Sequence, residues 1–525
     1  MSDTPTAAPR RRSGLFASTM VVSVMTLLSR VLGLVRDVVV ARMLGVSAGT
    51  DAFFVAFRIP NFLRRLFAEG AFNQAFVPVL SEYKERGSQA AVRHLIDRVA
   101  GTLGSALLLV TVLGVVGAPL LIGLFAPGFG DDPLQRALAV EMLRLTFPYL
   151  FFISLTAFAG AILNAWGRFA VPAFTPVLLN LCMIGAALLL APLFAPERMA
   201  VALAWGVLAA GVAQLLFQLP FLARLSLVPR PKIDTRDEGV VKIMKLMAPA
   251  LFGVSVSQIN LLLDTVLATL LETGSPTWLY YSDRLVELPL GIFGIAIATV
   301  ILPNLSRLHA GDTPEAFART LDWGIRLVVL VGLPAAAALA VISTPLLATL
   351  FHYGEFSVSD VAHSAASLQA YAFGLLAFML IKVLAPGFFA RQDTRTPVRI
   401  GVIALVANMV FNLILVWHLR HVGLALATAL SAWLNAGLLW RGLQRDGVYQ
   451  AAAGWWAFLV RVLVATLAMG LGIHYLASLT GVWFDGSALV RAGWLALVVI
   501  AGMAIYLLVL LVMGFKPRHL RRSPL

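Results

Sequence analysis

Long apolar segments alternate with short charged or Gly/Pro-containing breaks along almost all of this 525-residue chain. A bilayer core is about 30 Å thick, which an α-helix crosses in roughly 20 apolar residues. We therefore predict an all-α polytopic membrane protein with about 14 transmembrane helices. These helices are expected at 17–43, 52–80, 99–124, 138–163, 171–191, 200–222, 243–271, 277–305, 321–343, 366–389, 397–416, 423–440, 456–478 and 489–513.

The composition supports this class and excludes others. Hydrophobic residues make up 60% of the chain and charged residues 13%, and the mean hydropathy is +0.89. Soluble enzymes carry about twice that share of charge. The single Cys182 excludes a disulfide framework and a cysteine-based zinc or iron–sulfur site. The basic start of the chain is not followed by the short apolar region and cleavage site of a signal peptide.

The formal net charge of +14 is unusual for a chain expected to lie mostly in lipid. Of the 40 Lys and Arg residues, 26 fall in the tails and one set of alternating loops, whereas the opposite set holds Arg136, Arg198 and Arg420. The positive-inside rule then predicts that both termini are cytoplasmic. The remaining eleven basic residues lie inside or at the ends of the predicted helices. For three of them we expect snorkelling to an interface: Arg42, Arg461 and Arg491.

The two halves of the chain resemble each other at a shift of 225–227 residues. Asp37 matches Asp264, and the segment 71–81 matches 296–306. Paired repeats with a site between them are typical of transporters. We predict an N-terminal tail (1–16), an N-lobe (17–222), a basic cytoplasmic linker (223–242), a C-lobe (243–440), a cytoplasmic loop (441–455), two extra helices (456–513) and a basic tail (514–525).

Charged residues inside the predicted helices are the candidate functional residues. Arg30, Arg36 and Asp37 lie near the middle of the first helix, where facing lipid would be costly. We expect a local break at Gly33, which would let both arginines point the same way. The second helix places several polar residues on one face, and its repeat partner adds a further group: Asp51, Arg58, Asn61, Arg65, Glu69, Asp283, Arg284 and Glu287. Arg64 lies about 100° from Arg65 around that helix.

Two interpretations of these residues stay open. Internal Arg–carboxylate pairs, such as Arg65 with Glu69, would hold helices together. Alternatively, surplus arginines would line a water-filled cavity for an anionic substrate, because Arg recognises phosphate and carboxylate bidentately. A multidrug exporter for organic cations would instead place acidic or aromatic groups there.

A second candidate site is a set of oxygen-bearing side chains in the C-lobe. Asp264, Asn408, Asn412 and Thr428 lie on the seventh, eleventh and twelfth predicted helices and provide the oxygen ligands of a hard cation such as Na⁺. The alternative is a hydrogen-bonded structural cluster, since only Asp264 is charged.

Several segments resemble one known family. They are 29–37 (SRVLGLVRD), 50–57 (TDAFFVAF), 61–83 (NFLRRLFAEGAFNQAFVPVLSEY), 280–289 (YYSDRLVELP) and 385–397 (APGFFARQDTRTP). They closely resemble the lipid II flippases of the MurJ (MviN) family, within the multidrug/oligosaccharidyl-lipid/polysaccharide (MOP) exporter superfamily. The resemblance implies two six-helix lobes in a V-shaped bundle, a central cavity and alternating access.

The same resemblance implies roles for individual residues. The substrate-binding positions would be Arg30, Arg36, Arg64, Arg284, Asp37, Asp51, Asn61, Glu69, Asp283 and Glu287. The last two helices would form a groove for a polyprenyl tail, although an accessory pair that shields the bundle is the alternative.

The function implied is transport, not catalysis. Lipid II would be flipped from the cytoplasmic to the periplasmic leaflet of the bacterial inner membrane, with the arginines binding its diphosphate. No bond is broken and no cofactor is expected. Because the chain has no nucleotide-binding motif, a Na⁺ gradient or the membrane potential would drive the cycle. The expected partners are lipid II and membrane lipids, without nucleic acid, and we expect a monomer that associates with the cell-wall synthesis machinery.

Other functions fit the pattern less well. One alternative is a flippase for another polyprenyl-linked glycan, such as an O-antigen or capsule unit. Only the family-specific segments argue against it. A glycosyltransferase that uses lipid II would need acidic groups in a substantial extracytoplasmic loop. The longest such loop is expected at about 344–365 and is short.

Overall fold

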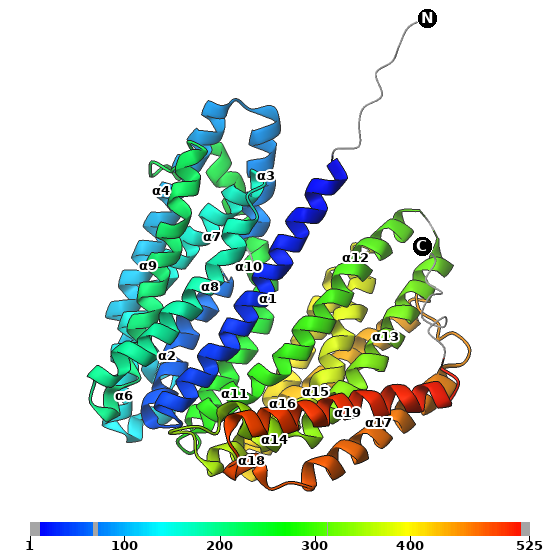
Figure 1. Cartoon of the computed structure of the whole chain (residues 1–525). Coiled ribbons are helices and arrows are strands. Elements are labelled where there is room, and N and C mark those ends of the chain that lie inside the picture. Colours follow the sequence, from blue (N-terminus) through cyan, green and yellow to red (C-terminus); the bar gives the residue numbers. More distant parts are fainter. Residues whose placement is uncertain (1–10, 67–71, 312, 516–525) are drawn as a thin grey trace, which may run out of the picture. The chain divides into compact units, whose positions relative to one another are not determined.

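The structure is a computed structural model that describes residues 11–66, 72–311 and 313–515, which form helices joined by short turns and contain no strand (Figure 1). The predicted all-α class is therefore confirmed. The α-helices are α1 (Arg11–Leu44), α2 (Ala48–Arg64), α3 (Phe72–Arg86), α4 (Gln89–Val116), α5 (Ala118–Phe125), α6 (Pro133–Thr146), α7 (Tyr149–Ala165), α8 (Ala170–Gly185), α9 (Val201–Arg224), α10 (Glu238–Thr269), α11 (Ser275–Pro289), α12 (Ile295–Ala310), α13 (Pro314–Val341), α14 (Ser343–Phe351), α15 (Val358–Phe389), α16 (Arg395–Arg445), α17 (Trp455–Ser478), α18 (Val482–Asp485) and α19 (Ala488–Val512). Short 3-10 or π segments are η2 (Pro127–Asp131), η3 (Ala186–Leu190), η4 (Ala191–Leu193), η5 (Pro196–Arg198) and η6 (Leu290–Gly294).

The chain divides into two compact units. Unit 1 comprises Met1–Leu44 and Ala48–Gln258, and unit 2 comprises Gly45–Ser47 and Ile259–Leu525. The division lies inside α10, whereas the predicted linker 223–242 belongs to unit 1.

In unit 1, α1 packs on α8, α2 on α6, and α9 on both α7 and α8. Phe76 lies at the centre of an aromatic cluster, 5.1 Å from Phe72 and 5.0 Å from Phe158 between ring centroids. Gly114 of α4 faces the ring of Phe147 so closely that a Cβ there would lie 2.1 Å from it. Small residues thus allow close helix packing, as is typical of membrane bundles.

In unit 2, α15 packs against α11, α13 and α16. A capping box formed by Ser357 and Asp360 begins α15, because each side chain accepts the other's backbone N–H. The helix α16 is interrupted at Arg420, whose φ of 50° is non-helical. This kink separates the two helices predicted at 397–416 and 423–440, so that prediction is confirmed.

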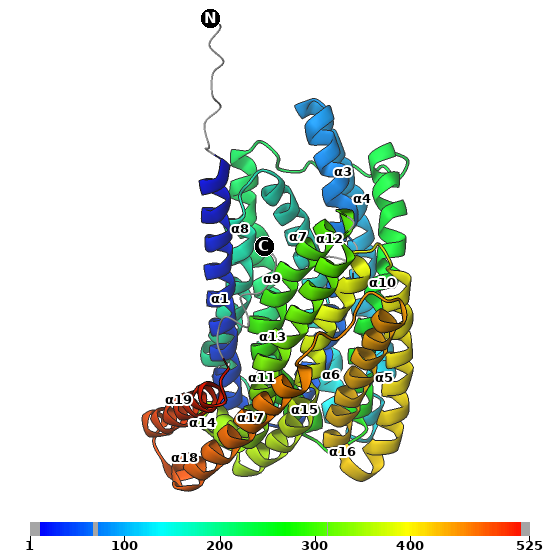
Figure 2. The same ribbon diagram turned by 90° about the vertical axis from the view of Figure 1, so that its right-hand side faces the viewer.

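The C-terminal helices α17 and α19 lie side by side in unit 2 (Figures 1 and 2). Arg491 of α19 is buried, and its Nη1 donates to the carbonyls of Ala348 (3.0 Å) and His352 (3.1 Å) near the end of α14. The prediction that Arg491 snorkels to an interface is therefore wrong. The guanidinium finds its partners in protein because those carbonyls lack helical partners of their own.

Several predicted segments differ from the structure, among them 138–163, which comprises α6 and α7. The segment 52–80 comprises two helices, α2 and α3, and residues 67–71 lie outside the described residues. The segment 99–124 is broken at Gly117, which ends α4 and precedes α5. The expected loop 344–365 contains most of α14 and the start of α15. Hydropathy alone locates apolar segments but not the turns inside them.

Nine helical stretches within the described ranges are long and apolar enough to cross a membrane. The stretch Arg395–Arg445 contains both predicted helices around the kink, and α1 is not among the nine. Large apolar side chains such as Leu113, Val116 and Leu471 are exposed on these helices, as expected for surfaces that face lipid.

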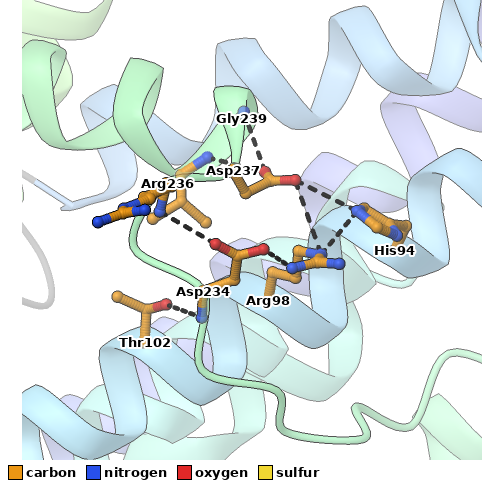
Figure 3. Close-up of polar contacts among 8 residues, drawn as sticks. His94, Arg98, Thr102, Asp234, Arg236, Asp237 and Gly239 are labelled. Carbon is orange, nitrogen blue, oxygen red and sulfur yellow. Dashed lines mark hydrogen bonds and ion pairs between the residues drawn. The ribbon is translucent and has the colours of Figure 1, made fainter.

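The basic segment between α9 and α10 is fixed to α4 by polar contacts (Figure 3). Arg98 of α4 forms an ion pair with Asp234, and His94 Nε2 lies 3.2 Å from Asp237 Oδ2. The backbone of Lys232 passes so close to Gly101 that a Cβ on this glycine would lie 2.3 Å from it. This segment of unit 1 is therefore held against α4 and is not a free linker.

Candidate functional site

The buried charge centre of unit 1 is Arg36 on α1. Its guanidinium donates from Nε (2.9 Å) and Nη2 (2.6 Å) to Asp37 Oδ1, and from Nη1 to Asn180 Oδ1 on α8 (3.1 Å). Nη1 also lies 3.9 Å from the sulfur of Met183. Arg36 and Asp37 are each 4% exposed, so they neutralise each other away from solvent. The interpretation as an internal ion pair is therefore correct for these two residues.

Asn180 also fixes the position of Arg30 along α1. Its Nδ2 donates to the carbonyl of Ser29 (3.0 Å), and it lies against Gly33, whose added Cβ would be 3.8 Å from the amide. The helix α1 is continuous through Gly33, so the predicted break is wrong. Arg30 is half-buried and has no hydrogen bond or ion pair with any described residue. Arg30 is thus a cation without a carboxylate partner within the described ranges.

The helix α2 carries the next group of candidate residues. Asp51 is fully buried in its first turn, and Arg64 Nε donates to Asn61 Oδ1 in its last turn (2.8 Å). Arg64 and Asn61 are both half-buried. Glu69 lies outside the described residues, so its predicted pairing with Arg65 stays a prediction.

In unit 2 the charged candidates lie on α11. Arg284 Nη1 donates to Glu287 Oε2 (3.0 Å), and its guanidinium carbon lies 5.6 Å from the centroid of the Tyr280 ring. Asp283 is half-buried beside it in sequence. This i, i+3 ion pair is partly exposed.

The polar residues predicted as a candidate cation site lie together in unit 2. Asp264 of α10 accepts hydrogen bonds from Asn412 Nδ2 (2.7 Å) and Thr428 Oγ1 (3.1 Å), both on α16. Asn408 lies one turn from Asn412 and, with its amide nitrogen turned to donate, lies 2.8 Å from Asn260 Oδ1. Asn260 is one helical turn before Asp264 and was not among the predicted residues.

The donor atoms of this cluster suit a hard cation. Asn412 is fully buried, and its Oδ1 has no hydrogen-bond donor among the described residues. Carboxylate, amide and hydroxyl oxygens are the ligands such a cation prefers. No group of three or more His, Cys, Asp or Glu residues gathers in the described chain, and Asp264 is the acidic residue in the contacts of this cluster.

The clusters in the two units correspond through the internal repeat. Asp37 and Asp264 are 227 residues apart, and Asn180 and Asn408 are 228 apart. Arg36, which bridges Asp37 and Asn180, corresponds to Leu263. Unit 1 therefore carries a fixed guanidinium where unit 2 has an apolar side chain. Asn180 could have been identified from sequence, because it lies at the repeat spacing from Asn408.

The last two helices are tied to unit 2 by polar contacts that the sequence did not predict. Asp322 of α13 accepts hydrogen bonds from Tyr449 Oη (2.9 Å) and Trp455 Nε1 (2.7 Å), and Arg326 pairs with its other oxygen (2.7 Å). These contacts hold the start of α17, while Arg491 holds the start of α19. The apolar outer faces of both helices stay exposed.

Comparisons with known proteins agree along nearly the whole chain. A family model described as "Lipid II flippase MurJ" matches residues 40–493. "Probable lipid II flippase MurJ" of Haemophilus influenzae is 51% identical over 509 residues, covering 94% of this chain and 99% of that protein. "Lipid II flippase MurJ" of Burkholderia cenocepacia is 42% identical over 514 residues, covering 97% and 99%.

Solved structures show the same fold. "Lipid II flippase MurJ, inward closed conformation" superposes with a TM-score of 0.78 at 26% identity and covers 93% of this chain and 98% of that chain. An inward-facing "multidrug resistance MATE family transporter of the MOP superfamily" gives a TM-score of 0.67 at 15% identity, covering 82% and 98%. The second likeness is one of fold alone, and it agrees with the predicted MOP-type bundle.

Proposed function

This chain belongs to the lipid II flippase MurJ family, and we propose that it binds the diphosphate of lipid II through arginines on α1, α2 and α11. It is a multi-pass membrane transporter and not an enzyme. Its role is to flip the lipid-linked peptidoglycan precursor between leaflets. The arginines assigned to the diphosphate are Arg30, Arg36 and Arg64 in unit 1 and Arg284 in unit 2.

The single observation that carries this assignment is the state of Arg30. Arg36 is already compensated by Asp37, and Arg284 is paired with Glu287. Arg30 is half-buried, directly follows Ser29, whose carbonyl accepts from the Asn180 amide, and has no anionic partner among the described residues. A guanidinium kept inside an apolar helix without a counter-ion is costly unless a ligand supplies the negative charge.

The acidic and amide residues have a positioning role in the proposal. Asp37 orients Arg36, Asn61 orients Arg64 and Glu287 orients Arg284, in each case through a hydrogen bond to the guanidinium. Asp51, Glu69 and Asp283 complete the proposed set. Orienting the guanidinium groups before the ligand arrives lowers the entropic cost of binding.

The proposal also covers orientation and surroundings. The excess of Lys and Arg in alternate loops favours cytoplasmic termini in a bacterial inner membrane. We propose that the chain works as a monomer, associates with the cell-wall synthesis machinery, and accommodates the polyprenyl tail along α17 and α19. The exposed apolar side chains of these helices, such as Leu467, Leu471 and Leu507, support the last point.

The coupling ion is proposed from the Asp264 cluster. Asp264, Asn260, Asn408, Asn412 and Thr428 would hold Na⁺, which would supply a positive charge that the cluster's own side chains lack. The support is the buried Oδ1 of Asn412, which accepts no hydrogen bond within the described residues. Membrane potential is the alternative source of energy.

A headgroup-accessibility assay tests the proposed function. Lipid II is placed in vesicles with the purified full-length chain, and the fraction that an impermeant probe reaches is followed over time. We expect Arg30→Gln to abolish flipping, whereas Arg93→Gln, an exposed arginine of α4, keeps the parent rate. A second polyprenyl-linked glycan in the same vesicles tests selectivity. Full activity of Arg30→Gln would overturn the diphosphate site, and equal flipping of both glycans would overturn specificity for lipid II.

A further inference from the structure

A second arginine-containing cavity lies in unit 1, apart from the residues assigned to lipid II. It has a volume of about 760 Å³ and is formed by α5, α6 and the first turns of α9. Arg136, Glu141 and Arg144 of α6 and Trp205 of α9 line it, together with small or apolar residues such as Pro119 and Val140. None of these residues takes part in the proposed flipping site.

The charges of this cavity do not balance. Glu141, the acidic residue in its lining, forms an ion pair with Arg198 at 2.6 Å and is thereby compensated. The guanidinium groups of Arg136 and Arg144 make no hydrogen bond or ion pair with any residue that the structure describes, and the indole N–H of Trp205 is likewise not donated. Two full positive charges and an additional donor therefore face one cavity.

The two arginines line the cavity from one helix, α6. They are eight residues apart, which corresponds to about 12 Å along the axis of α6. Both are exposed, and α6 with α7 forms one of the apolar stretches long enough to span the membrane. The arginines of the cavity thus lie in the N-terminal part of this stretch.

The surroundings are those of a lipid site. Leu120 and Leu124 on α5 and Leu134 at the start of α6 are all more than half exposed. Trp205 is 46% exposed, and partly exposed Trp residues are typical of the membrane interface. A soluble anion would use the arginines but not this apolar border, whereas a phospholipid would use both.

We propose that this cavity binds the phosphodiester headgroup of an anionic membrane phospholipid. Arg136 and Arg144 bind the phosphate oxygens, the Trp205 N–H donates to the headgroup, and an acyl chain lies on the exposed leucines of α5. Basic pockets between membrane helices recognise anionic lipids in this way. The bound lipid would form part of the outer surface of unit 1.

Native mass spectrometry of the full-length protein tests the proposal. Detergent-solubilised parent and Arg136→Gln/Arg144→Gln proteins are titrated with phosphatidylglycerol and, separately, with phosphatidylcholine. We expect the double variant to bind phosphatidylglycerol about 30-fold more weakly, from the loss of two phosphate-binding charges. The matched control is Arg93→Gln/Arg319→Gln, which removes two exposed arginines elsewhere and should bind as the parent does.

Two further measurements separate the outcomes. Brominated phosphatidylglycerol should quench fluorescence of the parent more than that of Trp205→Phe, which locates the lipid without touching an arginine. Inorganic phosphate at the same concentration should not displace the lipid. Unchanged phosphatidylglycerol binding in the double variant, equal binding of phosphatidylcholine, or displacement by inorganic phosphate would each overturn the proposal.

Discussion

Asn180 on α8 accepts a hydrogen bond of 3.1 Å from Arg36 on α1, across 144 positions of sequence. The same amide donates to the carbonyl of Ser29. One side chain therefore fixes both the buried guanidinium and the part of α1 that carries Arg30. This arrangement gives the two arginines different expected roles, because Arg36 has a carboxylate partner and Arg30 has none among the described residues.

Replacing Arg36 should therefore destabilise the protein as well as impair transport. Arg36→Gln leaves Asp37 buried and uncompensated, which we expect to cost about 3–5 kcal/mol. Adding Asp37→Asn should recover most of that stability without restoring flipping. Arg30→Gln should not destabilise the protein, because it removes a charge that has no carboxylate partner among the described residues, but it should abolish flipping. Unfolding of the purified proteins in detergent, together with the vesicle assay, measures both effects.

Two results would contradict the roles predicted for Arg30 and Arg36. If Arg36→Gln and Arg30→Gln lost equal stability, Arg30 would have a structural partner and could not be held for a ligand. If the Arg36→Gln/Asp37→Asn protein flipped lipid II at the parent rate, Arg36 would serve only to neutralise Asp37.

The Asp264 cluster predicts a sodium effect on stability. At a Na⁺ concentration 100 times the dissociation constant, a single site adds about 2.7 kcal/mol to the free energy of unfolding. We expect Asp264→Asn to fold, because an amide can replace the carboxylate in hydrogen bonding, but to lose this gain. Choline chloride at equal ionic strength is the control. A parent protein that responds equally to both salts has a purely structural cluster.

The hydrogen bonds of Arg491 predict that this residue anchors α19 to its neighbours. Arg491→Met leaves the carbonyls of Ala348 and His352 without their charged donor, and we expect a loss of about 3 kcal/mol. Hydrogen exchange in α14 and α18 should rise with it. Arg461→Met on α17 is the matched control, since Arg461 is half-buried and has no hydrogen bond or ion pair with a described residue. Equal effects of the two substitutions would show that Arg491 is not an anchor.

Asp393, in the turn before α16, predicts a local pH dependence. Hydrogen bonds from the Thr396 side chain and backbone lower the pKa of this carboxyl below its ordinary value. A lowered folded-state pKa contributes stability that is present above the unfolded pKa of about 3.9 and is lost as the pH falls through the folded value. The first turn of α16 should therefore open in acid, as hydrogen exchange would detect. Asp393→Asn can still accept these bonds but cannot titrate, so its exchange should lack this acid-dependent component.

The class of the protein and most of its helices follow from sequence alone, because hydropathy depends on composition within a segment. The sequence predicts fourteen apolar segments, the paired helices around Arg420 and the repeat of Asp37 at Asp264. Turns within apolar segments cannot be predicted in this way. Gly117 and the start of α14 interrupt helices, but the segments around them remain apolar.

Pairing of the charged residues was decided by tertiary structure. Eleven basic residues in or near the helices look alike in sequence, yet Arg36 is neutralised by Asp37, Arg491 is bound by backbone carbonyls, and Arg30 has no carboxylate partner in the part of the chain that the structure describes. The physical reason is that the energy of a charge in a membrane protein depends on the few groups within hydrogen-bonding distance. Those groups come from helices distant in sequence, and only the packing of the helices brings them together.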